Sequence, residues 1–287
     1  MTTRDQGTGP GGQRTRRAEP HHVEVDGLHT AYRRSGSGEP VLYLHGAAPY
    51  LTRGWLPFHE HLSESVDLVV PEHPGFGDTP LPPTLTGFAD VVLHYDAFLR
   101  ALDVDRPHVV GHALGGWIAM ELAITYPERF SSLTLVAPAG LRLPGVPQPD
   151  LFRLTAREQL DVLLNGRADR YEHLLVLDGE PDDTLRAYAE SVTHARLAWN
   201  PRYDVKLDER LGRVRIPTLV VRPDEDRAIP VEAAQRAVEL IPNARLETVS
   251  GPPDAPTGHL LLLQEPRALA EHIAGHVAAH PRNEVIA

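Results

Sequence analysis

The sequence predicts an α/β fold with a mostly parallel central sheet, flanked by helices and interrupted by a helical insertion. Short apolar runs alternate strictly with segments of helical periodicity as far as residue 137. The central runs are apolar throughout, which is typical of strands covered on both faces of a parallel sheet. The short connections between them imply right-handed βαβ units. From Pro138 to about Pro201 this alternation stops, and it resumes afterwards, so the insertion divides a single α/β domain.

The part of the chain before the insertion should contain most of the sheet. The turn Asp26-Gly27 separates two short β-prone stretches, which indicates a hairpin. Further strands are expected at residues 41–46, 66–71, 108–111 and 132–137. Helices are expected at residues 55–64, 88–102 and 114–126, where apolar residues recur at helical spacing.

The insertion and the last part of the chain complete the fold. Helices are expected at residues 151–164, 167–178 and 182–198 of the insertion, followed by strands at 216–222 and 244–249 and helices at 231–240 and 266–280. We divide the chain into an N-terminal arm (1–22), an α/β core (23–140 and 202–287) and the insertion (141–201). The arm is expected to be mobile because it has almost no apolar side chains to bury.

Composition excludes several classes of function. The net charge of −11 argues against a broad surface for nucleic acid or for an anionic membrane. The chain has no cysteine, and its sixteen histidines show no metal-ligand spacing, so we expect no metal site. No apolar run approaches the roughly 18 residues of a membrane span. Arg16-Arg17 precedes no apolar segment, so we expect no export signal and a cytoplasmic protein.

One stretch suggests a site for nucleophilic chemistry. Gly111-His112-Ala113-Leu114-Gly115 lies where a strand should turn sharply into a helix. It resembles the nucleophile elbow Gly-x-Ser-x-Gly of the α/β-hydrolase family. The resemblance implies the α/β-hydrolase fold over about residues 23–280, with the insertion as a lid above the site. Ala113 stands at the position of the nucleophilic serine.

Two further stretches resemble the same family, in its order along the chain. His45-Gly46-Ala47 follows a strand, where the family places a loop that supplies one backbone N–H to an oxyanion hole. By this resemblance the amides of Ala47 and Leu114 are the two donors. The loop Pro74-Gly75-Phe76-Gly77 resembles a structural loop of the family, and we assign it no chemistry.

The resemblance also supplies an acid and a histidine. Asp226 lies after the strand at 216–222 and four residues before a proline, as the family's acid does, and this spacing favours it over Asp224 and Glu225. His259 follows Gly258 before the last helix and matches the family's histidine. The sequence departs from the family pattern in two places. Pro223 stands where the family has glycine, and the loop at residues 251–256 before His259 is longer than the family's.

The substrate is expected to be a small apolar or aromatic molecule that contains a carbonyl group. The resemblance places His112 beside it, although His112 could equally be a packed loop histidine. We also expect His45, next to the oxyanion loop, and Trp199, one of the aromatic residues of the lid, to contact the substrate. Aromatic residues in the lid could bind such a molecule or form the lid's own core. Four lid arginines could pair with an anionic substrate, but solvated helix faces explain them better: Arg142, Arg153, Arg157 and Arg196.

Ala113 decides which chemistry remains. An alanine has no lone pair, so no acyl-enzyme can form there. The alanine is either the natural residue or a replacement for a serine, and the sequence leaves both open. If it is natural, His259 and Asp226 could act as acid and base in a cyclase, lyase, dehydratase or direct-water hydrolase, or the chain could bind a ligand without catalysis. If it replaces a serine, the parent is an ester, lactone or C–C bond hydrolase.

No cofactor is expected, because the sequence contains no dinucleotide or phosphate-loop motif. A small-molecule substrate is the only partner that the sequence indicates. The sequence predicts no particular oligomeric state.

Overall fold

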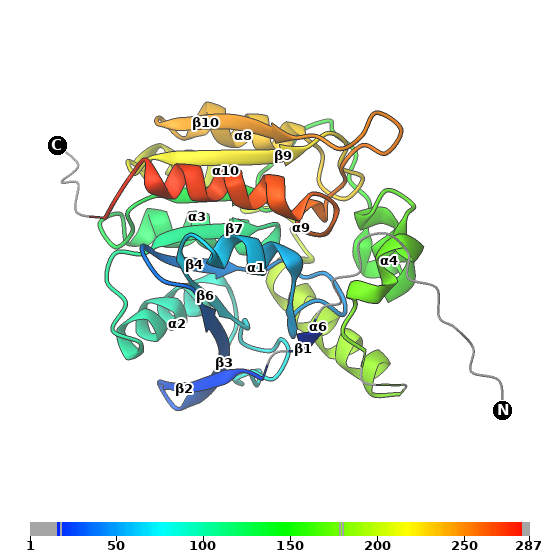
Figure 1. Cartoon of the computed structure of the whole chain (residues 1–287), viewed down its shortest axis with the longest axis horizontal. Helices are drawn as coiled ribbons and strands as arrows, with labels where there is room; N and C mark the ends of the chain where they lie inside the picture. The colour runs from blue at the N-terminus through cyan, green and yellow to red at the C-terminus, as the bar shows by residue number, and fades with distance from the viewer. Residues whose placement is uncertain (1–15, 18, 178, 180, 283–287) are drawn as a thin grey trace.

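The computed structural model describes residues 16–17, 19–177, 179 and 181–282. Its centre is a sheet in the order β10-β9-β8-β7-β4-β6-β3-β2 (Figure 1). The strands are β2 (His21–Val25), β3 (Leu28–Ser35), β4 (Pro40–Leu44), β6 (Asp67–Pro71), β7 (His108–His112), β8 (Leu133–Val136), β9 (Thr218–Pro223) and β10 (Ala244–Val249). β2, β3 and β6 pair antiparallel, and every other neighbouring pair is parallel.

The N-terminal arm lies largely outside the described residues. Within them, Arg16–Arg17 (β1) pairs antiparallel with Gly54–Trp55 (β5), and β2 begins at His21, two residues before the expected start of the core at residue 23. The structure therefore places the start of the core slightly earlier than the composition suggests.

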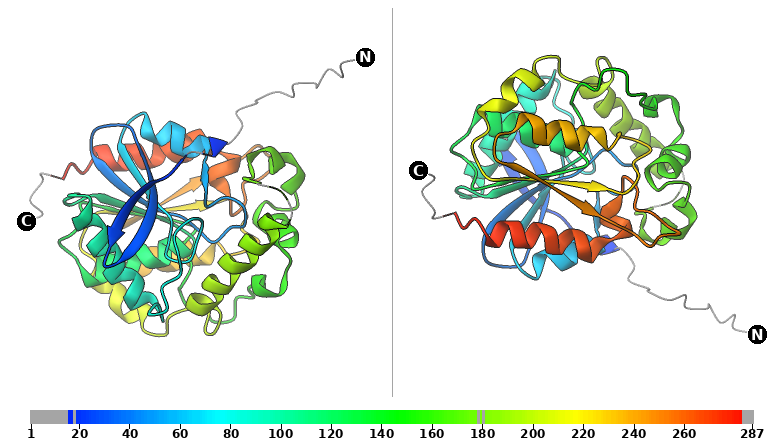
Figure 2. Two further views of the ribbon diagram at one scale, coloured as in Figure 1. Left: turned by 90° about the horizontal axis from the view of Figure 1, so that it is seen from below. Right: turned by 90° about the horizontal axis from the view of Figure 1, so that it is seen from above.

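Helices cover both faces of the sheet. α1 (Pro57–Ser63) and α10 (Pro266–Ala278) lie on one face, and α2 (Phe88–Ala101), α3 (Leu114–Thr125) and α8 (Glu232–Leu240) lie on the other (Figure 2). The central strands β4, β7 and β8 are buried at every residue because both of their faces are covered, as their continuous apolar sequences predict. None of the helices in the described part of the chain is long and apolar enough to cross a membrane.

The parallel register brings the ends of three strands together. Leu44 of β4 pairs with Gly111 of β7, which pairs in turn with Leu135 of β8. The loops that follow β4, β7 and β9 therefore leave the sheet at the same edge, where ligands bind in open α/β sheets.

The insertion consists of helical segments beyond this edge (Figure 1). They are η1 (Leu151–Arg153), α4 (Ala156–Leu163), α5 (Ala168–Tyr171), η2 (Glu172–Leu174) and α6 (Asp182–Ala198). Two short helical segments, α7 (Leu207–Arg210) and η3 (Leu211–Arg213), follow the insertion and precede β9. α6 has the expected bounds. The helix expected at residues 151–164 is divided because Thr155 and Glu158 form a capping box that starts a new helix. The helix expected at residues 167–178 is also shorter and ends in a 3₁₀ turn.

Candidate active site

The turn from β7 to α3 holds Ala113 in a strained backbone conformation. Its φ of 50° and ψ of −110° lie where residues other than glycine are rare. Close packing around it explains the neighbouring glycines. A Cβ at Gly111 would lie 2.2 Å from the carbonyl oxygen of Gly115, and one at Gly115 would lie 2.0 Å from that of Leu44. Strand and helix can therefore meet at this angle only with glycine at both positions.

Two backbone amides beside Ala113 have no hydrogen-bond partner among the described residues. One is the N–H of Leu114, the first residue of α3, and the other is the N–H of Ala47 in the loop after β4. Ala47, Ala113 and Leu114 line the same cavity. Unsatisfied amides at a helix start favour negative charge, so this position could stabilise an oxyanion.

His259 and Asp226 form a buried pair. Nδ1 of His259 lies 2.7 Å from Oδ2 of Asp226, and both side chains are almost fully buried. Oδ1 of Asp226 accepts the amides of Ala228 and Ile229, each at 2.8 Å. These bonds fix the carboxylate, which in turn orients the imidazole. Nε2 of His259 has no partner among the described residues and lies on the cavity side, so it could accept or donate a proton there.

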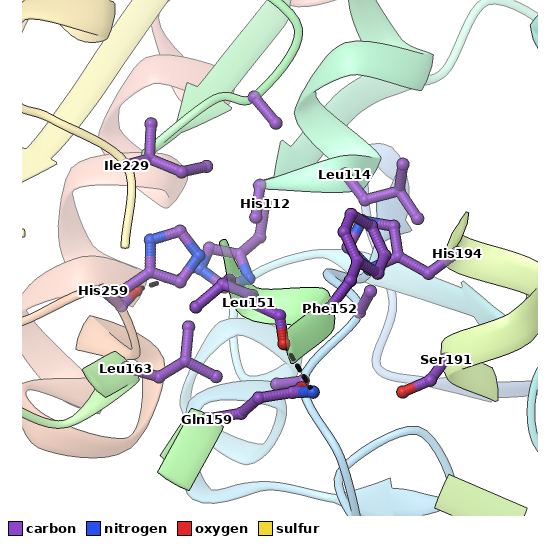
Figure 3. A pocket seen from close by; sticks show the side chains of 14 residues that line it. His112, Leu114, Leu151, Phe152, Gln159, Leu163, Ser191, His194, Ile229 and His259 are labelled. Atoms are coloured by element: carbon purple, nitrogen blue, oxygen red, sulfur yellow. Dashed lines mark hydrogen bonds between the residues drawn. The ribbon is translucent and has the colours of Figure 1, made fainter. Parts of the chain in front are cut away.

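His112 supports the same histidine from the elbow. Its Nε2 donates to the carbonyl oxygen of His259 at 3.0 Å, and the two rings lie 4.9 Å apart. Burial lowers the pKa of His112 to about 3, so its ring is neutral at physiological pH. His112 lines the cavity beside His259 (Figure 3).

The two departures from the family pattern lie away from the His259 side chain. β9 extends to Pro223, which pairs with Val249. Asp224 then accepts hydrogen bonds from Ser250 and from the amides of Gly251 and Thr257. Asp224 therefore holds the long loop before His259, while Asp226 contacts His259 itself.

The cavity has two walls of different origin. The core contributes the elbow, the loop after β4 and His259, and the insertion contributes residues of η1, α4 and α6 (Figure 3). From the insertion come Leu151, Phe152, Gln159, Leu163, Ser191 and His194. The cavity is narrow, with a volume of about 60 Å³ open to a water-sized molecule.

The structure does not place two of the expected substrate-binding residues in this cavity. His45 is buried behind it, stacked on His73 with ring centroids 3.8 Å apart, and its Nε2 accepts the amide of His73. Burial lowers the pKa of His45 to about 4. Trp199 is 58% exposed and lines a separate surface hollow with Arg142. It lies five residues beyond His194, about 140° further around the helix, and so faces away.

Sequence reasoning missed the residues that α6 contributes to the cavity. Ser191 and His194 are one turn apart, and each follows a residue that is buried against the core, Glu190 and Thr193. A polar pair at this spacing in the insertion was the available signal. No group of three or more histidine, aspartate or glutamate side chains in the described ranges could hold a metal ion.

Comparisons with known proteins agree with this fold. The chain belongs to the α/β hydrolase family, whose model matches residues 41–272. It is 29% identical over 243 residues to the 2-hydroxy-6-oxo-6-phenylhexa-2,4-dienoate hydrolase of Comamonas testosteroni, covering 76% of this chain and 82% of the relative. The 2-hydroxy-6-oxo-2,4-heptadienoate hydrolase of Pseudomonas putida is 25% identical, with 90% and 95% covered.

Solved structures show the same fold. The meta-cleavage product hydrolase of Pseudomonas fluorescens, solved as a serine-to-alanine mutant with acetates, has a TM-score of 0.71 at 23% identity. That comparison covers 90% of this chain and 97% of the other.

Proposed function

We propose that this chain catalyses acid–base chemistry at a carbonyl carbon of a small apolar or aromatic molecule, without a covalent nucleophile. The observation that carries the proposal is the free Nε2 of His259 on the same cavity as Ala113 and the unpartnered amides of Ala47 and Leu114. A base and an oxyanion site lie together, and only the nucleophilic hydroxyl is missing.

Direct hydrolysis by water is the reaction that best suits this arrangement. Nε2 of His259 takes a proton from a water molecule, and the water oxygen bonds to the substrate carbonyl carbon. The carbonyl oxygen becomes an oxyanion, which the amides of Ala47 and Leu114 stabilise. When the tetrahedral intermediate collapses, the bond to the leaving group breaks and His259 returns the proton to that group. Asp226 stabilises the imidazolium throughout.

The comparisons support hydrolysis over the other acid–base reactions. Relatives that share most of this chain's length are named as hydrolases of 2-hydroxy-6-oxo-dienoates, compounds with a carbonyl group. A cyclase, lyase or dehydratase would use the same proton transfer by His259. In each case the insertion, 141–201, would act as the lid above a core of 23–140 and 202–287, and we retain the cytoplasm as the expected location.

Turnover of neutral aromatic esters tests the proposal. The unchanged chain, His259→Ala and the control His272→Ala are incubated with para-nitrophenyl phenylacetate and with phenyl ketones. His272 lies on α10 with its side chain 35% exposed, so its loss controls for removal of an imidazole. We expect product from the unchanged chain and from the control. Product formation that survives in His259→Ala would contradict the proposal.

A hydrolase whose serine has been replaced is the second candidate. The φ of 50° at Ala113 favours this candidate. A strained backbone at this position directs a nucleophilic side chain into the active site, whereas it gives an alanine no function. This candidate predicts little turnover by the unchanged chain and a large gain from Ala113→Ser. Ligand binding without product in either form would instead indicate a non-catalytic binding protein.

A further inference from the structure

The side chains that line the cavity include no charged group from the insertion. Its polar lining consists of His112 and His259 on the core wall and Gln159, Ser191 and His194 on the insertion wall. The remaining residues that the structure describes there are alanine, leucine, isoleucine and phenylalanine. No lysine, arginine, aspartate or glutamate of the described chain is among them.

We infer that the cavity selects uncharged substrates, with an apolar or aromatic body and a neutral polar group at the end opposite His259. Ser191 and His194 would hold that group, and carboxylates would be rejected. This inference rests on the proposed function in taking the cavity as the substrate site, and it adds the chemical class of the substrate. The relative from Comamonas testosteroni is named for a dienoate, which carries a carboxylate.

The arginines that could have paired with a carboxylate point elsewhere. Arg157 forms ion pairs with Asp169 and Glu172 on the insertion surface. Arg142 lies over the ring of Tyr203, beside the separate hollow that contains Trp199. The side chains of Arg153 and Arg196 are exposed and do not line the cavity. A carboxylate in the cavity would therefore meet none of these guanidinium groups.

The insertion wall offers neutral hydrogen-bonding groups instead. The hydroxyl of Ser191 and the ring nitrogens of His194 have no partner in the described part of the chain. Burial lowers the pKa of His194 to about 4, so the ring is uncharged at neutral pH and can both donate and accept. His194 and Phe152 lie across the cavity from His259, and Ser191 lies on the same side as His194 (Figure 3).

The orientation of Ser191 and His194 is fixed because neighbouring residues of α6 bind to the core. Glu190 accepts the amide of Gly77 at 2.9 Å, and the hydroxyl of Thr193 donates to the carbonyl oxygen of Gly75 at 3.1 Å. Because Glu190 and Thr193 face the core, Ser191 and His194 face the cavity. The charge of Glu190 is therefore directed away from the substrate.

The physical cost of binding an anion here has two sources. A carboxylate that leaves water needs a cation or several donors, and the insertion wall supplies only neutral groups. The carboxylate of Asp226 also lies directly behind His259 and adds negative charge at the other end. A neutral amide, ketone or hydroxyl loses far less hydration and can hydrogen-bond to Ser191 and His194.

Binding of two probes of the same shape tests the inference without requiring catalysis. Para-acetylbenzamide and para-acetylbenzoate share a methyl ketone for the oxyanion site and differ only in the charge of the far group. Calorimetry with the unchanged chain at neutral pH should show the amide binding at least about tenfold more tightly. Equal or tighter binding of the carboxylate would overturn the inference, and so would the absence of binding by either probe.

A matched pair of variants then locates the selective wall. His194→Arg places a cation in the cavity and should reverse the order of the two probes. Val192→Arg adds the same charge to α6 at a side chain that is 37% exposed, and should leave the order unchanged. If the order of affinity reverses in both variants, the assignment of His194 to the selective wall is contradicted. It is also contradicted if the order reverses in neither variant while His194→Arg is folded. Because binding is read directly, a failure of the acid–base proposal would appear separately, as turnover insensitive to His259→Ala.

Discussion

Nδ1 of His259 lies 2.7 Å from Oδ2 of Asp226, and the elbow carries the methyl group of Ala113 where a serine hydroxyl would donate to Nε2 of His259. Asp226 is fixed by two amides, and His259 is held from the other side by His112. The two side chains are therefore held from both sides, while Ala113 carries no group that could act as a nucleophile.

Ala113→Ser should introduce a nucleophile without rebuilding the backbone. The elbow already holds residue 113 at the φ of 50° that presents a side chain to the cavity. We expect at least about a hundredfold gain in kcat/KM for para-nitrophenyl phenylacetate, because nucleophile and base act as a unit. The double variant Ala113→Ser with His259→Ala is the control. A folded Ala113→Ser protein with no gain would show that the amides or His259 are misplaced for acyl transfer.

Gly115→Ala should unfold or strongly destabilise the elbow. The added Cβ would lie 2.0 Å from the carbonyl oxygen of Leu44, so β4 and α3 would have to separate. We expect a loss of at least about 3 kcal/mol in the free energy of unfolding, measured by urea titration. Gly275→Ala in α10 is the matched control, since its Cβ would meet no atom within 4 Å. There we expect a gain of about 0.5–1 kcal/mol. Similar effects at both positions would contradict the packing argument.

Acid should destabilise this protein through its buried histidines. Burial lowers the pKa to about 3 or 4 for His45, His59, His94, His108, His112 and His194. As the pH falls from about 6.5 to about 4, the unfolded chain binds protons that the folded chain cannot, so stability falls. Urea midpoints measured across this range should decrease steeply. A midpoint independent of pH between these values would contradict the neutral, buried state of these rings.

Glu190→Gln should show the opposite dependence on pH. Desolvation raises the pKa of Glu190 to about 7, so the folded state holds a proton that the unfolded state releases above about pH 4.5. Ionisation therefore costs stability as the pH rises from about 4.5 to about 7. The variant should match the unchanged chain at acidic pH and exceed it by about 1–3 kcal/mol at pH 8. Glu209→Gln, at an exposed position, should show no such trend. A difference that stays constant with pH would contradict the raised pKa.

The sequence predicted the elements and motifs that depend on local pattern. The bounds of α6 and β10 agree with the structure because their periodicity and flanking residues are unambiguous. Asp226 and His259 were selected through the resemblance to family motifs that are short and local, and the structure brings the two side chains together.

What the sequence could not predict depends on contacts between distant residues. Glu190 and Gly77 are 113 positions apart, and their hydrogen bond helps decide which side of α6 faces the cavity. Trp199 was expected beside the substrate because aromatic residues are common there, but that orientation turns it outward. His45 was expected in the cavity. It is instead buried, because its ring stacks on that of His73, which lies after the neighbouring strand β6. His59 in α1 is also buried, and its Nδ1 accepts the amide of Leu56.

The rate of ester hydrolysis with and without His259 tests the central claim most directly. Initial rates of para-nitrophenyl phenylacetate hydrolysis are measured at neutral pH for the unchanged chain and for His259→Ala, after both are shown to be folded. We predict hydrolysis by the unchanged chain above the buffer rate and a loss of at least about a hundredfold in the variant. Equal rates in the two proteins would contradict the assignment of His259 as the base that activates water in place of a serine nucleophile.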